Sequence, residues 1–257
     1  MTFINAIRSI FFNILFYSWT AFIVISLSFT RFAKTYGPVR FGLHAWARVS
    51  VFLARWIMGI KVEVRGLEAF PKTGALILAA KHQSNIDPAL AFLTRNDVTA
   101  LAKKELFTMP FMGSVMRSMG VICVDRGKGT AHKSMDAVKD KVVEEARPLI
   151  IYPEGTRVPV GQRRKLKSGA YHIHADHHIP VYTVASNAGY FWSKGFWHKP
   201  GTIVYEIHTA VPDGLSKSDF MAYLHEKIVV RSDVLMREAG ADLPPLEDQP
   251  MRGKGKH

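Results

Sequence analysis

The sequence contains a single cysteine, Cys123, among its 257 residues, so no disulfide can form within the chain. It is also poor in acidic residues: 21 aspartates and glutamates stand against 34 lysines and arginines, which gives a formal net charge of +13. This excess predicts attraction to a polyanion, such as nucleic acid, an anionic membrane or a phosphorylated substrate. Nothing in the bulk composition indicates disorder, because 48% of the residues are hydrophobic and can form a sizeable core.

Charge is absent from one long segment near the N-terminus. Residues 10–30 read IFFNILFYSWTAFIVISLSFT and include no charged side chain. Because about 20 apolar residues suffice to cross a bilayer, we predict a membrane-anchoring helix here. Arg31, Lys34 and Arg40 follow it and favour a cytoplasmic location for the rest of the chain if the segment spans. A signal peptide is the alternative, but no small-residue cleavage site is evident and the apolar run is longer than usual for one.

A second apolar stretch, residues 41–60, is interrupted by His44, Arg48 and Arg55. The two arginines are seven residues apart and therefore share a helical face. This pattern is typical of a helix that lies in the membrane interface. We therefore predict that residues 1–60 form an anchoring and interfacial region.

From about residue 61, short apolar runs alternate with helical patterns. We expect strands at 75–80, 98–102, 121–124, 149–152, 180–185 and 202–211, and helices at 133–146, 168–178 and 216–239. Such alternation predicts an α/β domain, over residues 61–243, with both faces of its sheet covered. Cys123 falls within an apolar strand pattern and is expected in the core. The tail, residues 244–257, is proline-rich and then basic, and we expect it to be disordered.

Two candidate catalytic residues directly follow the first of these strands, in the sequence KHQSNIDPAL. The carboxylate of Asp87 can accept a hydrogen bond from one imidazole nitrogen of His82 and leave the other nitrogen as a general base. A simpler interpretation is that Asp87 only caps a helix that begins at Pro88. The same spacing recurs at His208 and Asp213, but His208 lies inside a predicted strand, and we interpret that pair as coincidental.

Four further segments follow or open predicted strands: KKEL at 103–106, GVICVDR at 120–126, YPEGTR at 152–157 and IPV at 179–181. Their positions predict that they converge on one edge of the sheet. Lys104, Arg126 and Arg157 would supply positive charge there, and arginine can hold a phosphate through two parallel hydrogen bonds. Gly155 would let the backbone approach a ligand closely.

Together, and in this order, these motifs resemble those of the glycerolipid acyltransferase family, and in particular of its bacterial 1-acyl-sn-glycerol-3-phosphate acyltransferases. The resemblance covers roughly residues 61–214. It implies an α/β fold with a mixed central sheet flanked by helices and with N-terminal hydrophobic helices docked on a membrane. It also implies that His82 is the base, that Asp87 orients it, and that an acceptor-binding set surrounds them: Lys104, Arg126, Glu154, Gly155, Thr156 and Arg157. The chain departs from the family pattern at Tyr152, Val158 and Thr183, where Phe, Ser and Pro are common, which bears on substrate preference.

By this resemblance the chain would transfer a fatty acyl group from acyl-CoA or acyl carrier protein to the sn-2 hydroxyl of lysophosphatidate, at the cytoplasmic face of the inner membrane. No acyl-enzyme stage and no cofactor are implied, and the sequence contains no GxSxG nucleophile motif. The expected partners are the two substrates, anionic membrane lipid and, as a candidate, acyl carrier protein.

Other functions stay open at this point. The acceptor can be a different lyso-lipid, such as a lyso-ornithine lipid or a lyso-phospholipid with another head group. A non-catalytic, basic membrane-binding protein on the same fold is disfavoured by the intact His82, Asp87 and EGTR sequence. A nucleic-acid-binding protein would explain the charge but not the apolar run at 10–30, so we expect no nucleic acid. We expect no metal either, because the histidines at 172, 174, 177 and 178 lack a third ligand at helical spacing.

Overall fold

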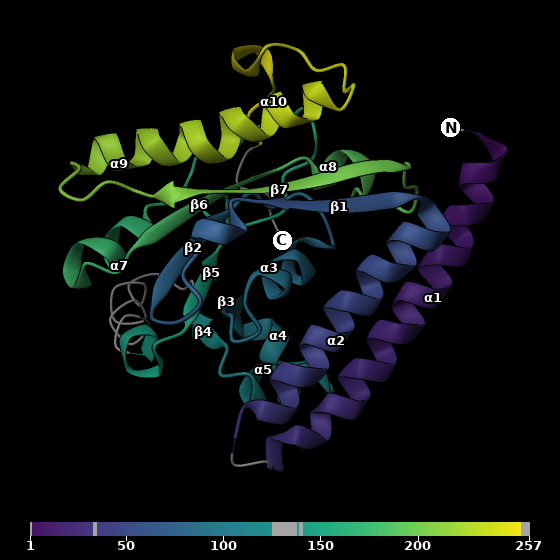
Figure 1. The fold of residues 1–257 in the computed structure, drawn as a ribbon, viewed down its shortest axis with the longest axis horizontal. Coiled ribbons are helices and arrows are strands. Elements are labelled where there is room, and N and C mark those ends of the chain that lie inside the picture. Colours follow the sequence, from purple (N-terminus) through teal and green to yellow (C-terminus); the bar gives the residue numbers. More distant parts are fainter. Residues whose placement is uncertain (1, 33–34, 125–137, 139–140, 253–257) are drawn as a thin grey trace.

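The fold is built on a seven-stranded sheet with helices on both faces (Figure 1). The structure, a computed structural model, describes residues 2–32, 35–124, 138 and 141–252. Its strands lie in the order β1-β7-β6-β2-β5-β3-β4, and all neighbours are parallel except β6 and β7. Their bounds are β1 Ile60–Arg65, β2 Leu76–Ala80, β3 Thr99–Lys103, β4 Ile122–Val124, β5 Pro148–Ile151, β6 Val181–Ser186 and β7 Gly201–Ala210. The mixed sheet and its six predicted strands are confirmed, with ends shifted by at most one residue.

The sequence analysis did not assign β1, whose sequence IKVEVR alternates polar and apolar residues. It is an edge strand, paired in parallel with β7 alone, so its polar side chains can stay in contact with solvent. Gly59, with a φ of 70°, ends the preceding helix and lets the chain turn into this strand. At the opposite edge, Cys123 on β4 is exposed, so the expectation that it lies in the core is wrong; among the described residues β4 pairs with β3 alone.

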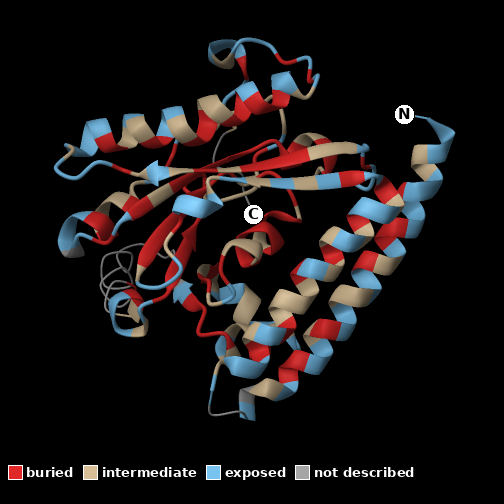
Figure 2. Ribbon diagram, in the orientation of Figure 1, coloured by how far each residue is buried: buried red, intermediate tan, exposed pale blue. Residues whose placement is uncertain are grey.

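Strand β2 shows how the core is divided between the two faces of the sheet. Its five residues are all buried. Leu76, Leu78 and Ala80 pack with helices of one face, while Ile77 and Ala79 pack with helices of the other, as alternation along a strand requires. The first face carries α3 (Asp87–Thr94) and α5 (Met112–Ser118), with α4 (Lys104–Thr108) between them in sequence, and the second carries α7 (Gly169–His177). In Figure 2 the buried residues, in red, are concentrated along the central strands of the sheet.

The N-terminal region forms a helical hairpin that packs on the first face (Figure 1). Helix α1 spans Phe3–Ser28, and α2 spans Gly37–Leu53 and continues as a π-helical turn over Ala54–Met58. Among the described helices, α1 is long and apolar enough to cross a membrane, judged by length and composition alone. One side of α1 is buried in the domain, whereas large apolar side chains cover its other side, including Phe3, Ile7, Ile14 and Phe22. The predicted apolar helices are therefore present, and they share the core of the α/β domain.

The C-terminal part of the chain covers the second face of the sheet as one long helix (Figure 1). It comprises α9 (Lys217–Leu224), a π-helical turn (His225–Val230) and α10 (Arg231–Glu238). Ser216 caps it by accepting a hydrogen bond from the amide of Asp219, which confirms the predicted start.

The tail that follows this helix is ordered up to residue 252, so the expectation of disorder is wrong for residues 244–252. Gln249 is buried and donates a hydrogen bond to Asp233 Oδ1 over 2.7 Å. Arg163 donates to the carbonyl oxygen of Glu247 over 2.7 Å. Composition did not reveal this order, because the stabilising partners lie on distant segments.

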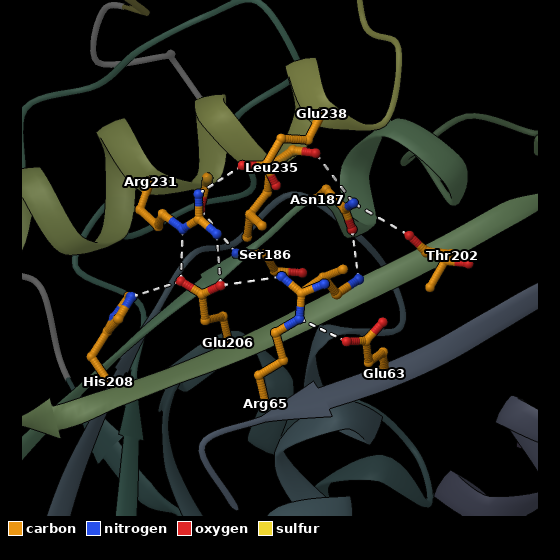
Figure 3. Close-up of polar contacts among 12 residues, drawn as sticks. Glu63, Arg65, Ser186, Asn187, Thr202, Glu206, His208, Arg231, Leu235 and Glu238 are labelled. Carbon is orange, nitrogen blue, oxygen red and sulfur yellow. Dashed lines mark hydrogen bonds and ion pairs between the residues drawn. The ribbon is translucent and has the colours of Figure 1, made fainter.

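A set of charged side chains, the Glu206 network, links the sheet to α10 (Figure 3). Glu206 on β7 accepts two hydrogen bonds from Arg231 of α10, at 2.7 and 2.9 Å. Arg65 of β1 lies 3.5 Å from the same carboxylate. Hydrogen bonding from Arg231 lowers the pKa of Glu206 from 4.5 to about 2. The network therefore ties three elements together as long as this carboxylate is ionised.

We expect Glu206→Gln to lower the melting temperature by about 2–8 °C at neutral pH, which corresponds to about 1–2 kcal/mol for a partly exposed charged pair. Because folding lowers the pKa of Glu206, its contribution is present above pH 4.5 and is lost as the pH falls toward about 2. The difference between wild type and variant should therefore shrink over that interval. Asp242→Asn, at an exposed carboxylate with no ion pair among the described residues, is the control and should melt like wild type. A difference that persists at pH 2 would contradict this assignment.

Candidate active site

The catalytic loop, residues 81–87, runs from the end of β2 to the first residue of α3 and holds both predicted catalytic residues. His82 Nδ1 lies 2.8 Å from Asp87 Oδ2. The same carboxylate oxygen accepts hydrogen bonds from the backbone amides of Gln83 and Ser84, each over 2.8 Å. The Asp87 side chain thus folds back onto its own loop instead of only capping the helix. This conformation places the imidazole and the carboxylate in direct contact.

The pair has the geometry of a general base. Asp87 is buried, whereas the His82 side chain keeps 18% of its surface exposed. Because the ionised carboxylate is an acceptor only, Nδ1 carries the proton and donates it, which leaves Nε2 with a free lone pair. His82 can therefore take a proton from a bound hydroxyl group, and Asp87 stabilises the imidazolium that forms.

The YPEGTR segment packs directly against this loop. The ring of Tyr152 stacks on the His82 imidazole, with centroids 3.9 Å apart and planes 16° from parallel. The amide of Val158 donates to the carbonyl oxygen of His82 over 2.9 Å. Gly155 has a φ of 69°, a left-handed conformation that glycine adopts without strain, and it closes the turn by donating to the carbonyl of Tyr152. These contacts fix the plane of the imidazole from one side.

A buried ion pair joins the two loops. Lys81 Nζ lies 2.6 Å from Glu154 Oε1, with side-chain exposures of 3% and 0%. Glu154 Oε2 accepts from the amide of His82 over 3.3 Å. In this structure the Glu154 carboxylate is buried and paired with Lys81, and its contact with an acceptor stays a prediction. Sequence analysis missed Lys81, although it directly precedes His82.

Positive charge lies beside the pair, as predicted for an anionic ligand. Arg157 is half-buried and donates a hydrogen bond from Nη1 to Asn85 Oδ1. A Cβ atom added to Gly155 would lie 2.8 Å from Lys167 Nζ, so this lysine covers the same turn. Lys167 ends the basic run RRKLK at 163–167, and it was not among the predicted site residues. The structure places Arg157 and Lys167 at the loop that packs on His82.

The remaining predicted residues lie less close or outside the described chain. Thr156 is half-buried between Gly155 and Arg157. Lys104 is exposed at the start of α4, directly after β3. Because β3 lies two strands from β2 in the order β2-β5-β3, its end is about 10 Å from the end of β2 at the usual strand spacing. Arg126 lies outside the described residues.

The second His–Asp pair is not formed. His208 Nε2 lies 3.1 Å from Glu206 Oε1 (Figure 3), and its Nδ1 lies 3.0 Å from Thr183 Oγ1. Burial lowers the pKa of His208. Asp213 instead comes within 4.0 Å of His174 Nε2. His208 is thus part of the Glu206 network, as expected of a side chain inside a strand.

Comparison with known proteins identifies the family. The family model "Acyltransferase" matches residues 61–187. The 1-acyl-sn-glycerol-3-phosphate acyltransferase of Pseudomonas aeruginosa is 32% identical over 256 residues, covering 97% of this chain and 96% of that protein. The chain belongs to the glycerolipid acyltransferase family. Within this family, the protein of the same name from Borreliella burgdorferi is 30% identical over 67% of this chain and 70% of its own length.

A solved structure of this acyltransferase family shares the fold. The 1-acyl-sn-glycerophosphate (LPA) acyltransferase of Thermotoga maritima superposes with a TM-score of 0.70 at 20% identity, over 94% of this chain and 100% of that one. Because the superposition covers 94% of this chain, it extends beyond residues 61–187 and must include most of the N-terminal hairpin. The shared fold therefore includes helices outside the matched family segment.

We expect His82→Ala to reduce the acyl-transfer rate by about 10²-fold or more, because a positioned general base contributes about that much. The matched control is His208→Ala. It removes the histidine that precedes Asp213 by five residues, as His82 precedes Asp87, and its rate should stay near that of the wild type. Both rates are measured on purified protein together with a melting curve, since His82→Ala should melt normally. An inactive His208→Ala beside an active His82→Ala would show that the site lies elsewhere.

Proposed function

We propose that this acyltransferase is a 1-acyl-sn-glycerol-3-phosphate acyltransferase, which forms phosphatidate from lysophosphatidate in phospholipid biosynthesis. The observation that carries the proposal is the His82–Asp87 pair with the Arg157 loop packed directly against it. A general base beside an arginine suits a substrate that carries both a hydroxyl and a phosphate. The relatives from Pseudomonas aeruginosa and Borreliella burgdorferi bear the name of this activity.

The proposed reaction is a direct acyl transfer. The sn-2 hydroxyl of lysophosphatidate gives its proton to His82 Nε2 while its oxygen attacks the thioester carbonyl of acyl-CoA or acyl carrier protein. The new ester C–O bond forms, the C–S bond breaks, and the departing thiolate takes the proton from the imidazolium. Asp87 holds the imidazole and stabilises its cationic form throughout. The scheme uses neither an acyl-enzyme intermediate nor a cofactor.

We further propose that the phosphate of the acceptor lies at Arg157. A phosphate monoester carries more negative charge than a diester, and it leaves its oxygens open to a planar guanidinium. Lys167 over the Gly155 turn adds charge to the same place. A head group such as choline or ethanolamine would hinder this approach, so the site suits lysophosphatidate better than other lyso-lipids.

The way α1 lies on the domain supports a position at the membrane surface. Near the middle of α1, Asn13 donates to the carbonyl of Phe196, and at its C-terminal end Ser28 accepts from the hydroxyl of Ser114. One side of α1 therefore contacts the α/β domain along much of its length, and its outer side is apolar and exposed. We propose that the hairpin dips into one leaflet of the inner membrane from the cytoplasmic side, with anionic lipid attracted by the net charge of +13.

Arg157→Ala should raise KM for lysophosphatidate strongly and leave kcat less affected, because the lost contact binds the phosphate. Arg157→Lys should restore affinity only in part, since lysine lacks the planar fork. Lys72→Ala removes one positive charge before the opposite end of β2 and should leave KM unchanged. A melting curve for each variant separates lost binding from a collapsed loop. If Arg157→Ala were saturated at the same lysophosphatidate concentration as the wild type, the assignment of the phosphate to Arg157 would be contradicted.

The choice of acceptor is tested with the wild-type enzyme and a radiolabelled acyl donor. Lysophosphatidate should be turned over faster than lyso-phosphatidylcholine or a lyso-ornithine lipid. Faster turnover of either of the other two acceptors would assign the enzyme to that lyso-lipid. Parallel reactions with acyl-CoA and with acyl carrier protein identify the donor.

High salt should not release the full-length protein from membranes, whereas detergent should. Burial of the apolar outer side of α1 is not screened by ions, although the attraction to anionic lipid is. The measurement is the fraction of protein in the pellet after a wash in about 1 M salt, where charges are screened beyond roughly 3 Å. Clean extraction by salt would contradict insertion of the hairpin and favour a purely electrostatic contact.

A further inference from the structure

The catalytic loop is tied to a distant segment through Ser84. This buried serine lies between His82 and Asp87 in the loop. Its hydroxyl donates to the carbonyl oxygen of Trp192 over 2.5 Å and accepts from the amide of Ile86 over 3.2 Å. Its own amide donates to Asp87 Oδ2. The position of the Trp192 carbonyl therefore affects where the carboxylate, and through it the imidazole, is held.

Helix α1 in turn holds Trp192. The indole is 1% exposed and is among the largest fully buried side chains. Phe12 meets it edge-on with ring centroids 4.8 Å apart, and Phe16 does so at 4.9 Å. These two phenylalanines are buried on one side of α1, one helical turn apart. Because the rings are closely packed, the indole cannot shift unless α1 shifts as well.

Polar contacts fix the position of α1 along the segment that follows Trp192. Asn13 donates to the carbonyl of Phe196 over 2.8 Å, and His198 Nε2 lies 3.1 Å from Asn13 Oδ1. The amide of His198 donates to Ser9 Oγ over 3.2 Å. Burial lowers the pKa of His198 to about 4, so its ring is neutral at neutral pH and Nε2–H is the donor. Such directional bonds allow α1 only one register against the domain.

We infer that Trp192 is a positioning residue through which the docking of α1 sets the geometry of the catalytic loop. Phe12 and Phe16 contact the indole, its carbonyl holds Ser84, and Ser84 belongs to the hydrogen bonds that shape the Asp87 turn. Helix α1 thus contributes to catalysis as well as to membrane attachment. A displacement of about 1 Å at a catalytic group can cost on the order of 10²-fold in rate, so loosening of α1 should be visible in turnover.

Amide hydrogen exchange tests the inference without reference to the reaction. We compare Phe12→Ala with Phe11→Ala in the full-length protein in detergent micelles. The two changes remove the same ring from adjacent positions, but Phe12 is fully buried and Phe11 is 55% exposed. The amides of Gln83, Ser84 and Ile86 should exchange several-fold faster in Phe12→Ala than in wild type, and Phe11→Ala should exchange like wild type. Phe12→Leu removes the edge-on ring contact with Trp192 but keeps the position apolar; it should also speed exchange of the loop, and it serves if Phe12→Ala does not fold.

A second test measures kcat and KM for lysophosphatidate, and it rests on the proposed function. With micellar lysophosphatidate, Phe12→Ala should lower kcat by up to about 10²-fold and leave KM unchanged. Ser84→Ala removes the link to Trp192 and should also lower kcat. Because the two residues act through one path, Phe12→Ala should add little further loss in the Ser84→Ala background. If each change only destabilised the protein, each would lower the fraction of active protein separately. The losses of activity from Phe12→Ala and Ser84→Ala would then add in the double variant.

Each outcome is decisive. Faster exchange of the loop in Phe12→Ala, with non-additive losses of kcat, supports the inference. Normal exchange of the loop in a folded Phe12→Ala or Phe12→Leu protein, or losses that add in the double variant, would overturn it. Wild-type protein that does not turn over lysophosphatidate would contradict the proposed function, while the exchange measurement would still decide the role of Trp192.

Discussion

One carboxylate oxygen, Asp87 Oδ2, accepts hydrogen bonds from an imidazole and from two backbone amides, and the catalytic loop takes its shape from these three bonds. An ionised carboxylate with several donors is strongly stabilised, so the turn and the base are formed by one group. If the carboxylate were lost, the two amides and the imidazole would lose their acceptor together. The position of the base therefore depends on the same interaction as the local backbone.

Around this turn, the molecule surrounds the base with partners from distant parts of the chain. The Lys81–Glu154 pair joins the loop to the YPEGTR turn, and Tyr152 stacks on the ring of His82. A buried ion pair is weak support for overall stability, because desolvation offsets much of the attraction, but it does specify which loops meet. Glu154 also accepts a hydrogen bond from the amide of His82, so it links the two loops at the site.

The N-terminal hairpin shows why anchor and catalytic domain cannot be treated as separate units. Phe12 and Phe16 belong to the same hydrophobic cluster as Leu76 and Leu78 of β2. The outer side of α1 is apolar and exposed, whereas its inner side is buried in the protein core. Lipid and the core would therefore contact different sides of the helix. Under the proposed function, the same helix would be buried in the domain on one side and in a leaflet on the other, close to the lipid substrates.

The sequence by itself determined the features that depend on near neighbours along the chain. Apolar runs and local patterns predicted six strands and the apolar helices. The spacing of His82 and Asp87 did not single out the pair, because His208 and Asp213 share it; the position of the pair directly after a strand and the ordered motifs downstream did. Tertiary structure alone decided what Glu154 pairs with, which carbonyl holds Ser84, and that residues 244–252 are ordered. Lys81 and Glu154 are 73 residues apart, and Ser84 and Trp192 are 108 apart. Local patterns carry no information about such partners, since burial and pairing depend on which segments the sheet order brings together.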